Sequence, residues 1–277
     1  MGAPEPAPGY PPPMISNGLL LPLSLLLACT NPASGPSQTP AAADPAPIRP
    51  GEDEPTIDER AERVLWRMGR HLAAAKGLEL RAHIQADEAH PSGQWVQVER
   101  TAEISVHRER GMRTSVSGDL GHREMWCDLE TAGMYDPESG FYSLVEVPGD
   151  LDGALDHLLS EYGFSWPLAD LAYSDPFVTM IEGVELGSYV GMHTVGDTPC
   201  HHLAFRQESI DWQIWVDAGP HPLPRKIVIN YRGIEGMPRY SAVLADWRLD
   251  SFLPEVMFEY DLPADAVQIE MESLGDQ

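Results

Sequence analysis

A cysteine directly after an apolar run is the first residue of this chain with recognisable chemistry. Residues 18–28 are almost entirely apolar, and residues 26–29 read Leu-Leu-Ala-Cys. Two aliphatic residues, a small residue and a cysteine have the order of a bacterial lipobox, in which the cysteine is acylated. The run is too short to cross ~30 Å of hydrocarbon as a helix, but it suits the apolar part of a signal peptide. The pattern predicts a lipoprotein signal peptide over residues 1–28 and a lipid on Cys29.

An ordinary secretory signal with an incidental cysteine is the alternative interpretation. Signal peptides usually open with basic residues, yet the first Lys or Arg of this chain is Arg49. A start at Met14 instead of Met1 does not add a charge, so both starts stay open. If Cys29 is acylated, two acyl chains anchor the protein stably. Thr30, in place of an aspartate, favours the outer membrane, facing the periplasm, over the inner membrane.

Histidines and a cysteine form the best candidate for a metal site. Cys200, His201 and His202 are consecutive, and His193 lies shortly before them. Neighbouring side chains on a strand point to opposite faces, so His201 and His202 cannot chelate one ion together. We therefore predict no metal and no other cofactor.

Cys127 and Cys200 remain as an even pair once Cys29 carries lipid. Export permits a disulfide between them, and the chain-entropy model credits such a bond with about 4 kcal/mol. Bonding requires the two Cα atoms to lie within ~7 Å, whereas a sequentially connected antiparallel sheet keeps them several strands apart. We predict two unpaired cysteines, with Cys200 at a strand start and Cys127 at least partly buried.

Catalytic signatures are mostly absent from the sequence. It contains no GxGxxG, P-loop, HExxH or CxxC motif. Residues 163–167 begin like the nucleophile elbow of a hydrolase but end in proline rather than glycine. Asp170 and Asp175 could be paired acids, but both flank a short helical turn and capping explains them better. We predict that the protein is not an enzyme.

Aromatic side chains give a different lead. They concentrate in the predicted strands and in a helical insert between residues 151 and 181. Ordinary core packing accounts for most of them, but a curved sheet and its helical cover could also enclose an apolar cavity. The residues predicted to bind a ligand in such a cavity are Phe164, Trp166, Phe177, Met180 and Trp126.

Composition limits the classes of partner. The 277 residues carry a net charge of -25, and 43% of them are hydrophobic. So acidic a chain lacks the basic footprint that nucleic acid requires, and its domain surface is unsuited to anionic lipid. The part beyond the signal is long enough for one large domain with its own core.

Three regions follow one another along the chain. Beyond the signal, residues 29–55 are rich in Pro, Ala, Ser and Thr and predict a disordered tether. Thr56 and Glu59 have capping-box spacing, and apolar residues then recur on one helical face as far as Gly77. The pattern predicts an amphipathic helix that opens a single domain over residues 56–277.

Strands are predicted wherever apolar and polar residues alternate. They cover residues 78–86, 96–106, 113–117, 123–129, 141–147, 184–195, 200–207, 211–217, 225–232 and 240–249. Helical spacing covers residues 151–162, and two short helices open at Pro167 and Pro176. Short turns between successive strands mean antiparallel pairing, so the fold class is α+β with one large curved sheet.

Several segments together resemble a bacterial predicted-periplasmic family, domain of unknown function 2092, over about residues 58–270. They are residues 168–176 (LADLAYSDP), 189–191 (YVG), 200–206 (CHHLAFR), 212–215 (WQIW) and 222–226 (PLPRK). That family is similar in fold to the lipoprotein-localisation-factor superfamily of lipoprotein carriers, their outer-membrane receptor and an envelope-stress regulator. The resemblance implies a half-barrel of antiparallel strands whose concave face is plugged by helices and can hold acyl chains.

Two functional hypotheses follow. The first is a non-enzymatic envelope lipoprotein that binds an apolar ligand, such as an acyl chain or lipid, beneath its helical plug. The alternative is a protein-interaction or envelope-sensor module whose half-barrel is solidly packed. The expected partners are an apolar small molecule or lipid, the membrane through the N-terminal lipid anchor, and an envelope protein, but not nucleic acid.

Overall fold

One curved antiparallel sheet dominates the structure, a computed structural model that describes residues 56–274. Its strands are β1 (Gly77–Ala89), β2 (Trp95–His107), β3 (Gly111–Gly118), β4 (Gly121–Cys127), β5 (Thr131–Asp136), β6 (Phe141–Glu146), β7 (Leu186–Val195), β8 (Thr198–Arg206), β9 (Ile210–Asp217), β10 (Pro224–Tyr231), β11 (Arg239–Leu249) and β12 (Val267–Gln268). The helices are α1 (Glu59–Ala73), α2 (Leu151–Tyr162) and α3 (Pro176–Ile181), with 3-10 turns η1 (Ala169–Leu171) and η2 (Glu255–Met257). The predicted α+β half-barrel is confirmed.

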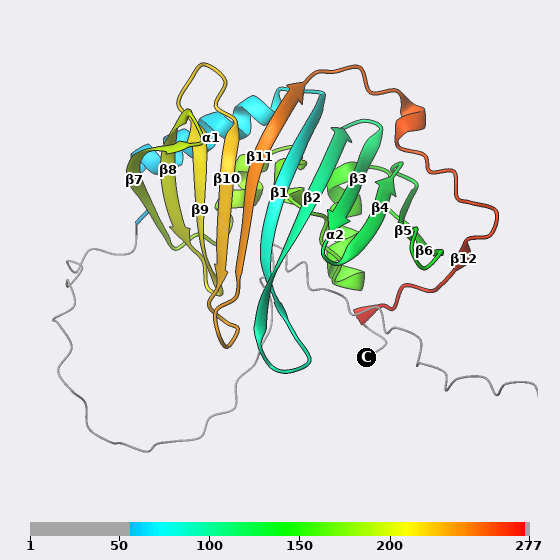
Figure 1. Ribbon diagram of the computed structural model, residues 1–277. Coiled ribbons are helices and arrows are strands. Elements are labelled where there is room, and N and C mark those ends of the chain that lie inside the picture. Colours follow the sequence, from blue (N-terminus) through cyan, green and yellow to red (C-terminus); the bar gives the residue numbers. More distant parts are fainter. Residues whose placement is uncertain (1–55, 275–277) are drawn as a thin grey trace, which may run out of the picture.

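The order of the strands places the helical insert across the sheet. That order is β12-β6-β5-β4-β3-β2-β1-β11-β10-β9-β8-β7, so β6 and β7 are consecutive in the chain but lie at opposite ends of the sheet. The connection between them, residues 147–185, contains α2, η1 and α3. We call this connection the plug. Figure 1 shows the plug and α1 on the same side of the sheet.

The pairing register shows which strand residues face the plug. Trp166 of the plug donates a hydrogen bond from Nε1 to Thr114 Oγ1 at 2.9 Å, so Thr114 points to the plugged, concave face. Thr114 pairs with Ile104 on one side and Met125 on the other, and side chains of paired residues share a face. The concave side of the sheet is largely apolar, and it shares one hydrophobic core with α1 and the plug.

The first helix begins later than predicted. Asp58, not Thr56, is its cap, and its carboxylate accepts hydrogen bonds from the backbone of Arg60 and Ala61. Ile57 instead forms a parallel bridge with Gly187 at the outer edge of β7. The helix ends at Ala73, and Gly77 opens β1 rather than closing the helix.

Strand β5 lies in a segment that the sequence did not predict as a strand. Gly133 interrupts its apolar alternation, but the glycine has a steric reason. A Cβ at this position would overlap the indole ring of Trp126 on the neighbouring strand. The missing side chain therefore makes room for a tryptophan, and β5 was overlooked for that reason.

Cys127 and Cys200 are unpaired and buried, as predicted. They lie on β4 and β8, with β3, β2, β1, β11, β10 and β9 between them. The predicted sequential order was wrong, because β11 returns to pair with β1 in the middle of the sheet. Burial raises the pKa of Cys127 to about 11, so its thiol stays protonated and unreactive near neutral pH.

The C-terminal segment covers the outer face of the sheet opposite the plug. Leu253 and Phe258 are buried there, and Tyr260 stacks on Trp126 with 4.6 Å between ring centroids. Strand β12 then pairs in parallel with β6. Within residues 56–274, no helix has the length and apolar character needed to cross a membrane.

Candidate functional site

The plug is built from short helices with local start and stop signals. Asp150 caps α2 by accepting a hydrogen bond from Gly153 N at 2.8 Å, and Gly163 ends the helix in the left-handed conformation at φ 62°. Asp175 caps α3 through Val178 N at 3.2 Å, and Pro176 occupies its first turn. The predicted capping role of Asp175 is confirmed.

Asp170 does not have the capping role that was predicted for it. The residue before η1 is Leu168, and no side chain caps this turn. Asp170 lies in η1, within the plug, and its side chain is half-buried. Loss of contact with water raises the pKa of its carboxyl from an ordinary value near 3.8 to about 6. The sequence could not reveal this because the groups that desolvate Asp170 come from distant segments.

Four of the five predicted ligand-binding residues lie on the plug and contribute to the core that the plug shares with the concave face. Trp166 and Met180 are buried in the apolar layer between plug and sheet, and Phe164 and Phe177 pack against the same layer. The rings of Phe164 and Trp166 meet edge to face at 5.8 Å. These side chains form the inner surface of the plug.

Close packing also joins the plug to α1. A Cβ built on Gly69 of α1 would lie 2.7 Å from both the backbone nitrogen and the Cβ of Phe177. Only glycine lets the two helices approach so closely, and α1 and α3 thereby form one cover over the concave face.

The fifth residue, Trp126, lies on the other side of the sheet. It pairs with Arg113, the neighbour of Thr114, so its side chain points to the outer face. There it stacks on Tyr260 of the C-terminal segment. The structure therefore does not bring Trp126 together with the four plug residues.

Arg108, in the turn between β2 and β3, is an important contact of the plug that the sequence did not suggest. Its guanidinium donates hydrogen bonds to four backbone carbonyls, two near the end of α1 and two in the plug. These acceptors are Leu72 at 3.0 Å, Ala75 at 3.2 Å, Ala172 at 2.5 Å and Tyr173. One side chain thus ties α1, the plug and the sheet together.

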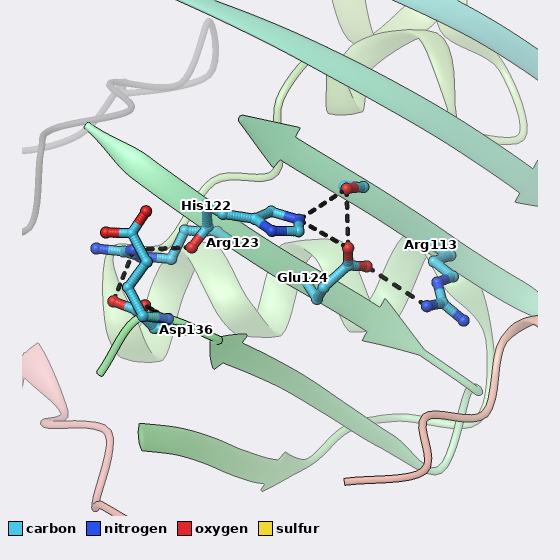
Figure 2. A network of polar contacts seen from close by, with 7 residues as sticks. Arg113, His122, Arg123, Glu124 and Asp136 are labelled. Atoms are coloured by element: carbon cyan, nitrogen blue, oxygen red, sulfur yellow. Dashed lines mark hydrogen bonds and ion pairs between the residues drawn. The ribbon is translucent and has the colours of Figure 1, made fainter. Parts of the chain in front are cut away.

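A Ser, His and Glu group on the outer face has the residue types of a catalytic triad but not its geometry (Figure 2). His122 Nε2 lies 3.1 Å from Ser115 Oγ and 2.9 Å from Glu124 Oε1. In a triad the acid binds the other ring nitrogen, which leaves Nε2 free to take the serine proton. Here Glu124 occupies Nε2 and also accepts a hydrogen bond from Ser115 at 2.8 Å. This arrangement does not activate a nucleophile.

The histidines around Cys200 divide between the faces, as predicted. His201 contacts Tyr189 Oη at 2.9 Å, whereas His202 contacts His193 at 2.9 Å and Gln213 at 3.0 Å. Within the described part of the chain, no three His, Cys, Asp or Glu side chains gather as a metal site.

A polar hollow of about 340 Å³ lies where β11, β1, β2 and β3 run side by side. It is lined by residues such as His83, Gln85, Glu99 and Ser241. These side chains alternate with the core-facing ones, so the hollow opens on the outer face. Its polar lining makes it unlike the apolar cavity that the aromatic pattern suggested.

The amino-acid sequence matches a family described as "Predicted periplasmic protein (DUF2092)" over residues 61–272. The chain belongs to this family. The predicted membership is confirmed, and the description of the DUF2092 family places the protein in the periplasm of the cell envelope. No curated protein matches the sequence.

Several solved structures resemble this DUF2092 chain at low identity. An uncharacterized conserved protein from Thermus thermophilus is 12% identical, with a TM-score of 0.46 over 76% of this chain and 99% of that one. Lipoprotein LppX from Mycobacterium tuberculosis is 8% identical, with a TM-score of 0.43 over 69% and 96%. A LolA superfamily protein from Nitrosomonas europaea is 10% identical, with a TM-score of 0.35 over 72% and 97%. We base the functional proposal on the geometry of this chain.

Proposed function

We propose that this protein is a non-enzymatic envelope protein that binds an apolar ligand, such as an acyl chain or a lipid, between its plug and the concave face of its sheet. The observation that carries the proposal is the way the plug is attached. The plug crosses the sheet from β6, next to one edge, to β7 at the other edge. Between its two ends, the backbone of residues 148–184 makes no hydrogen bond to the backbone of the other described residues.

Few polar contacts hold the plug down. The backbone hydrogen bonds of residues 148–184 stay within the plug. At its two ends the plug is joined by backbone bonds from Val147 to Glu130 and from Glu185 to Arg206. Its other polar ties include side-chain contacts from Trp166 to Thr114, from Arg108 to two plug carbonyls and from Gln207 Nε2 to Glu182 O at 2.6 Å. Lifting the plug therefore breaks no strand pairing and uncovers a largely apolar surface.

An acyl chain is suited to cover the apolar surfaces that would be exposed to water when the plug lifts from the sheet. Burial of apolar area stabilises a complex by ~25 cal/mol per Å², and a flexible chain adapts to a surface of irregular side chains. The inner side of the plug, with Phe164, Trp166, Phe177 and Met180, would form one wall of the site. The other wall would be the apolar concave face.

Native mass spectrometry of gently purified protein tests the proposal. We expect a co-purifying lipid and, after its removal, uptake of an environment-sensitive acyl dye. Phe177→Asp should lower dye uptake at least tenfold, because it places a charge against the apolar layer, in a partly buried position. Phe252→Asp is the matched control, since Phe252 is 86% exposed.

Circular dichroism must show that the variants are folded. If Phe177→Asp is unfolded, Phe164→Asp replaces it as the test variant. A clean ligand-free mass together with no dye uptake by the wild type would contradict lipid binding. Unchanged uptake by both folded variants would remove Phe164 and Phe177 from the site.

A protein-interaction module is the second candidate, and the outer edge of β7 favours it. Beyond Gly187, which bonds to the segment before α1, the strand carries no charged residue and exposes Val190 and Met192. Edge strands usually carry charges that discourage pairing. An extended segment of another envelope protein could add to this edge as a further strand.

The predicted lipid anchor lies outside the described residues and is part of the proposal. Residues 1–28 would be the lipoprotein signal, Cys29 the acylated N-terminus and residues 29–55 the tether, with the outer membrane as its location. Labelling cells with a palmitate analogue should tag the wild type but not Cys29→Ser. Equal labelling of both, or a soluble mature protein that begins elsewhere, would contradict the anchor.

A further inference from the structure

Several buried hydrogen-bonding atoms of the described residues lack partners, and two of them lie close together on the concave side. Arg100 Nε and Tyr240 Oη have no hydrogen-bond partner among the described residues. The Arg100 side chain is only 9% exposed. Leaving a buried polar group unsatisfied costs about 1–3 kcal/mol, so such groups call for an explanation.

The register brings these two residues to the same part of the concave face. On β1, Ile84 pairs with Arg100 of β2, and Ala86 pairs with Tyr240 of β11. Ile84 and Ala86 are two residues apart and both point to the core, so Arg100 and Tyr240 flank β1 on the plugged side. Their long side chains can therefore reach a common point above β1.

The charged groups around these two atoms include one base and two acids. Arg100 forms an ion pair with Glu88, whose side chain is 20% exposed. Asp170 approaches from the plug. Burial raises the pKa of Tyr231 and Tyr240, and the nearby Asp170 carboxyl raises both further. Arg100 Nε and Tyr240 Oη are thus two unused hydrogen-bond donors in surroundings that have no excess of positive charge.

We propose that Arg100 Nε and Tyr240 Oη bind the carbonyl oxygen of a neutral acyl ester or amide, whose hydrocarbon chain extends beneath the plug. This inference rests on the proposed function and specifies the chemical class of its ligand. Both atoms can donate a hydrogen bond, and a carbonyl oxygen accepts two. An anionic head group suits the place less well, because Glu88 already neutralises Arg100 and Asp170 adds a further acid.

Three pyrene probes with the same twelve-carbon chain separate the contributions. They are a hydrocarbon (1-dodecylpyrene), the methyl ester of pyrenedodecanoic acid, and the free acid. At pH 8 we expect the mature wild-type protein to bind the ester about tenfold more tightly than the hydrocarbon, the worth of about one good hydrogen bond. The free acid should bind more weakly than the ester.

Tyr240→Phe removes only the hydroxyl group. It should lower the preference for the ester several-fold, because only the Arg100 donor remains, and it should affect hydrocarbon binding much less. The variant should be at least as stable as the wild type, since the lost hydroxyl is buried and unpartnered. Tyr260→Phe, on the outer face, is the matched control and should keep the preference.

The outcomes distinguish this inference from the proposed function. Equal binding of ester and hydrocarbon, or a preference that is undiminished in Tyr240→Phe, would overturn the carbonyl site while lipid binding stands. Tighter binding of the free acid than of the ester would overturn the assignment of a neutral ligand. If none of the probes binds, both the inference and the proposed function fail.

Discussion

Arg108→Met is expected to lower the free energy of unfolding by about 3 kcal/mol. The substitution keeps much of the side-chain volume but removes the donors to Leu72, Ala75, Ala172 and Tyr173. Hydrogen bonds to a charged group contribute about 1.5–3 kcal/mol each, and carbonyls left without a donor are partly rescued by water. The loss should therefore exceed that of one hydrogen bond but fall below the sum of four.

Urea denaturation followed by tryptophan fluorescence measures this effect. Arg110→Met is the matched control. Arg110 reaches a single carbonyl, Leu253 O at 2.5 Å, so this substitution should lower the free energy of unfolding by about 1.5 kcal/mol. Arg108→Lys should lower the free energy of unfolding by an amount between those of Arg110→Met and Arg108→Met, because lysine keeps the charge but loses the planar guanidinium group. If Arg108→Met is within about 1 kcal/mol of the wild type, the guanidinium does not hold the plug.

The same variants connect stability to the proposed function. Arg108 ties the plug to α1 and to the turn between β2 and β3, so its loss should favour the open arrangement. We expect Arg108→Met to take up an acyl dye faster than Arg110→Met, measured by stopped-flow fluorescence. Equal uptake rates would mean that the opening step does not involve these contacts.

Asp170→Asn is expected to stabilise the protein by about 2 kcal/mol above pH 6 and to have little effect near pH 4. The folded protein holds the Asp170 proton up to about pH 6, whereas the ordinary value is near 3.8. In that window the folded state binds more protons than the unfolded state, so the wild type loses stability as pH rises. The figure is reduced from the full effect of the pKa change because Asp170 is half-buried rather than fully enclosed.

Unfolding free energies of wild type and Asp170→Asn should be compared from pH 4 to pH 8. The difference between them should grow between pH 4 and pH 6 and then stay constant. Asp197→Asn, in the exposed turn between β7 and β8, is the control and should show no such change. A difference that does not vary with pH would show that the Asp170 carboxyl titrates normally.

Local sequence patterns were sufficient for most of the secondary structure. Alternating apolar residues predicted β1 and β2 because these strands have one covered face and one largely exposed face. The apolar spacing around Leu155 and Leu158 predicted α2 for the corresponding reason. The pattern also separated His201 from His202 correctly, because it depends only on the two-residue period of a strand.

The alternation of apolar and polar residues could not show which way a side chain points where both faces of the sheet are covered. Met125, Trp126 and Cys127 are consecutive and all buried, which is typical of a strand with packing on each side. The plug covers the side of Met125, and the C-terminal segment covers the side of Trp126. Burial alone could not tell which of them faces the plug, so Trp126 was assigned to the wrong group of neighbours.

By itself, the sequence determined the family, most of the order of helices and strands, and the aromatic character of the plug, because these depend on residues close together in the chain. Only the tertiary structure decided that β11 returns to β1, which sends the plug across the whole concave face. It also decided that Arg100 and Tyr240 flank β1, and that Asp170 is desolvated beneath the plug. Each depends on pairing between distant strands, whose register is set by packing over the whole sheet rather than by local spacing.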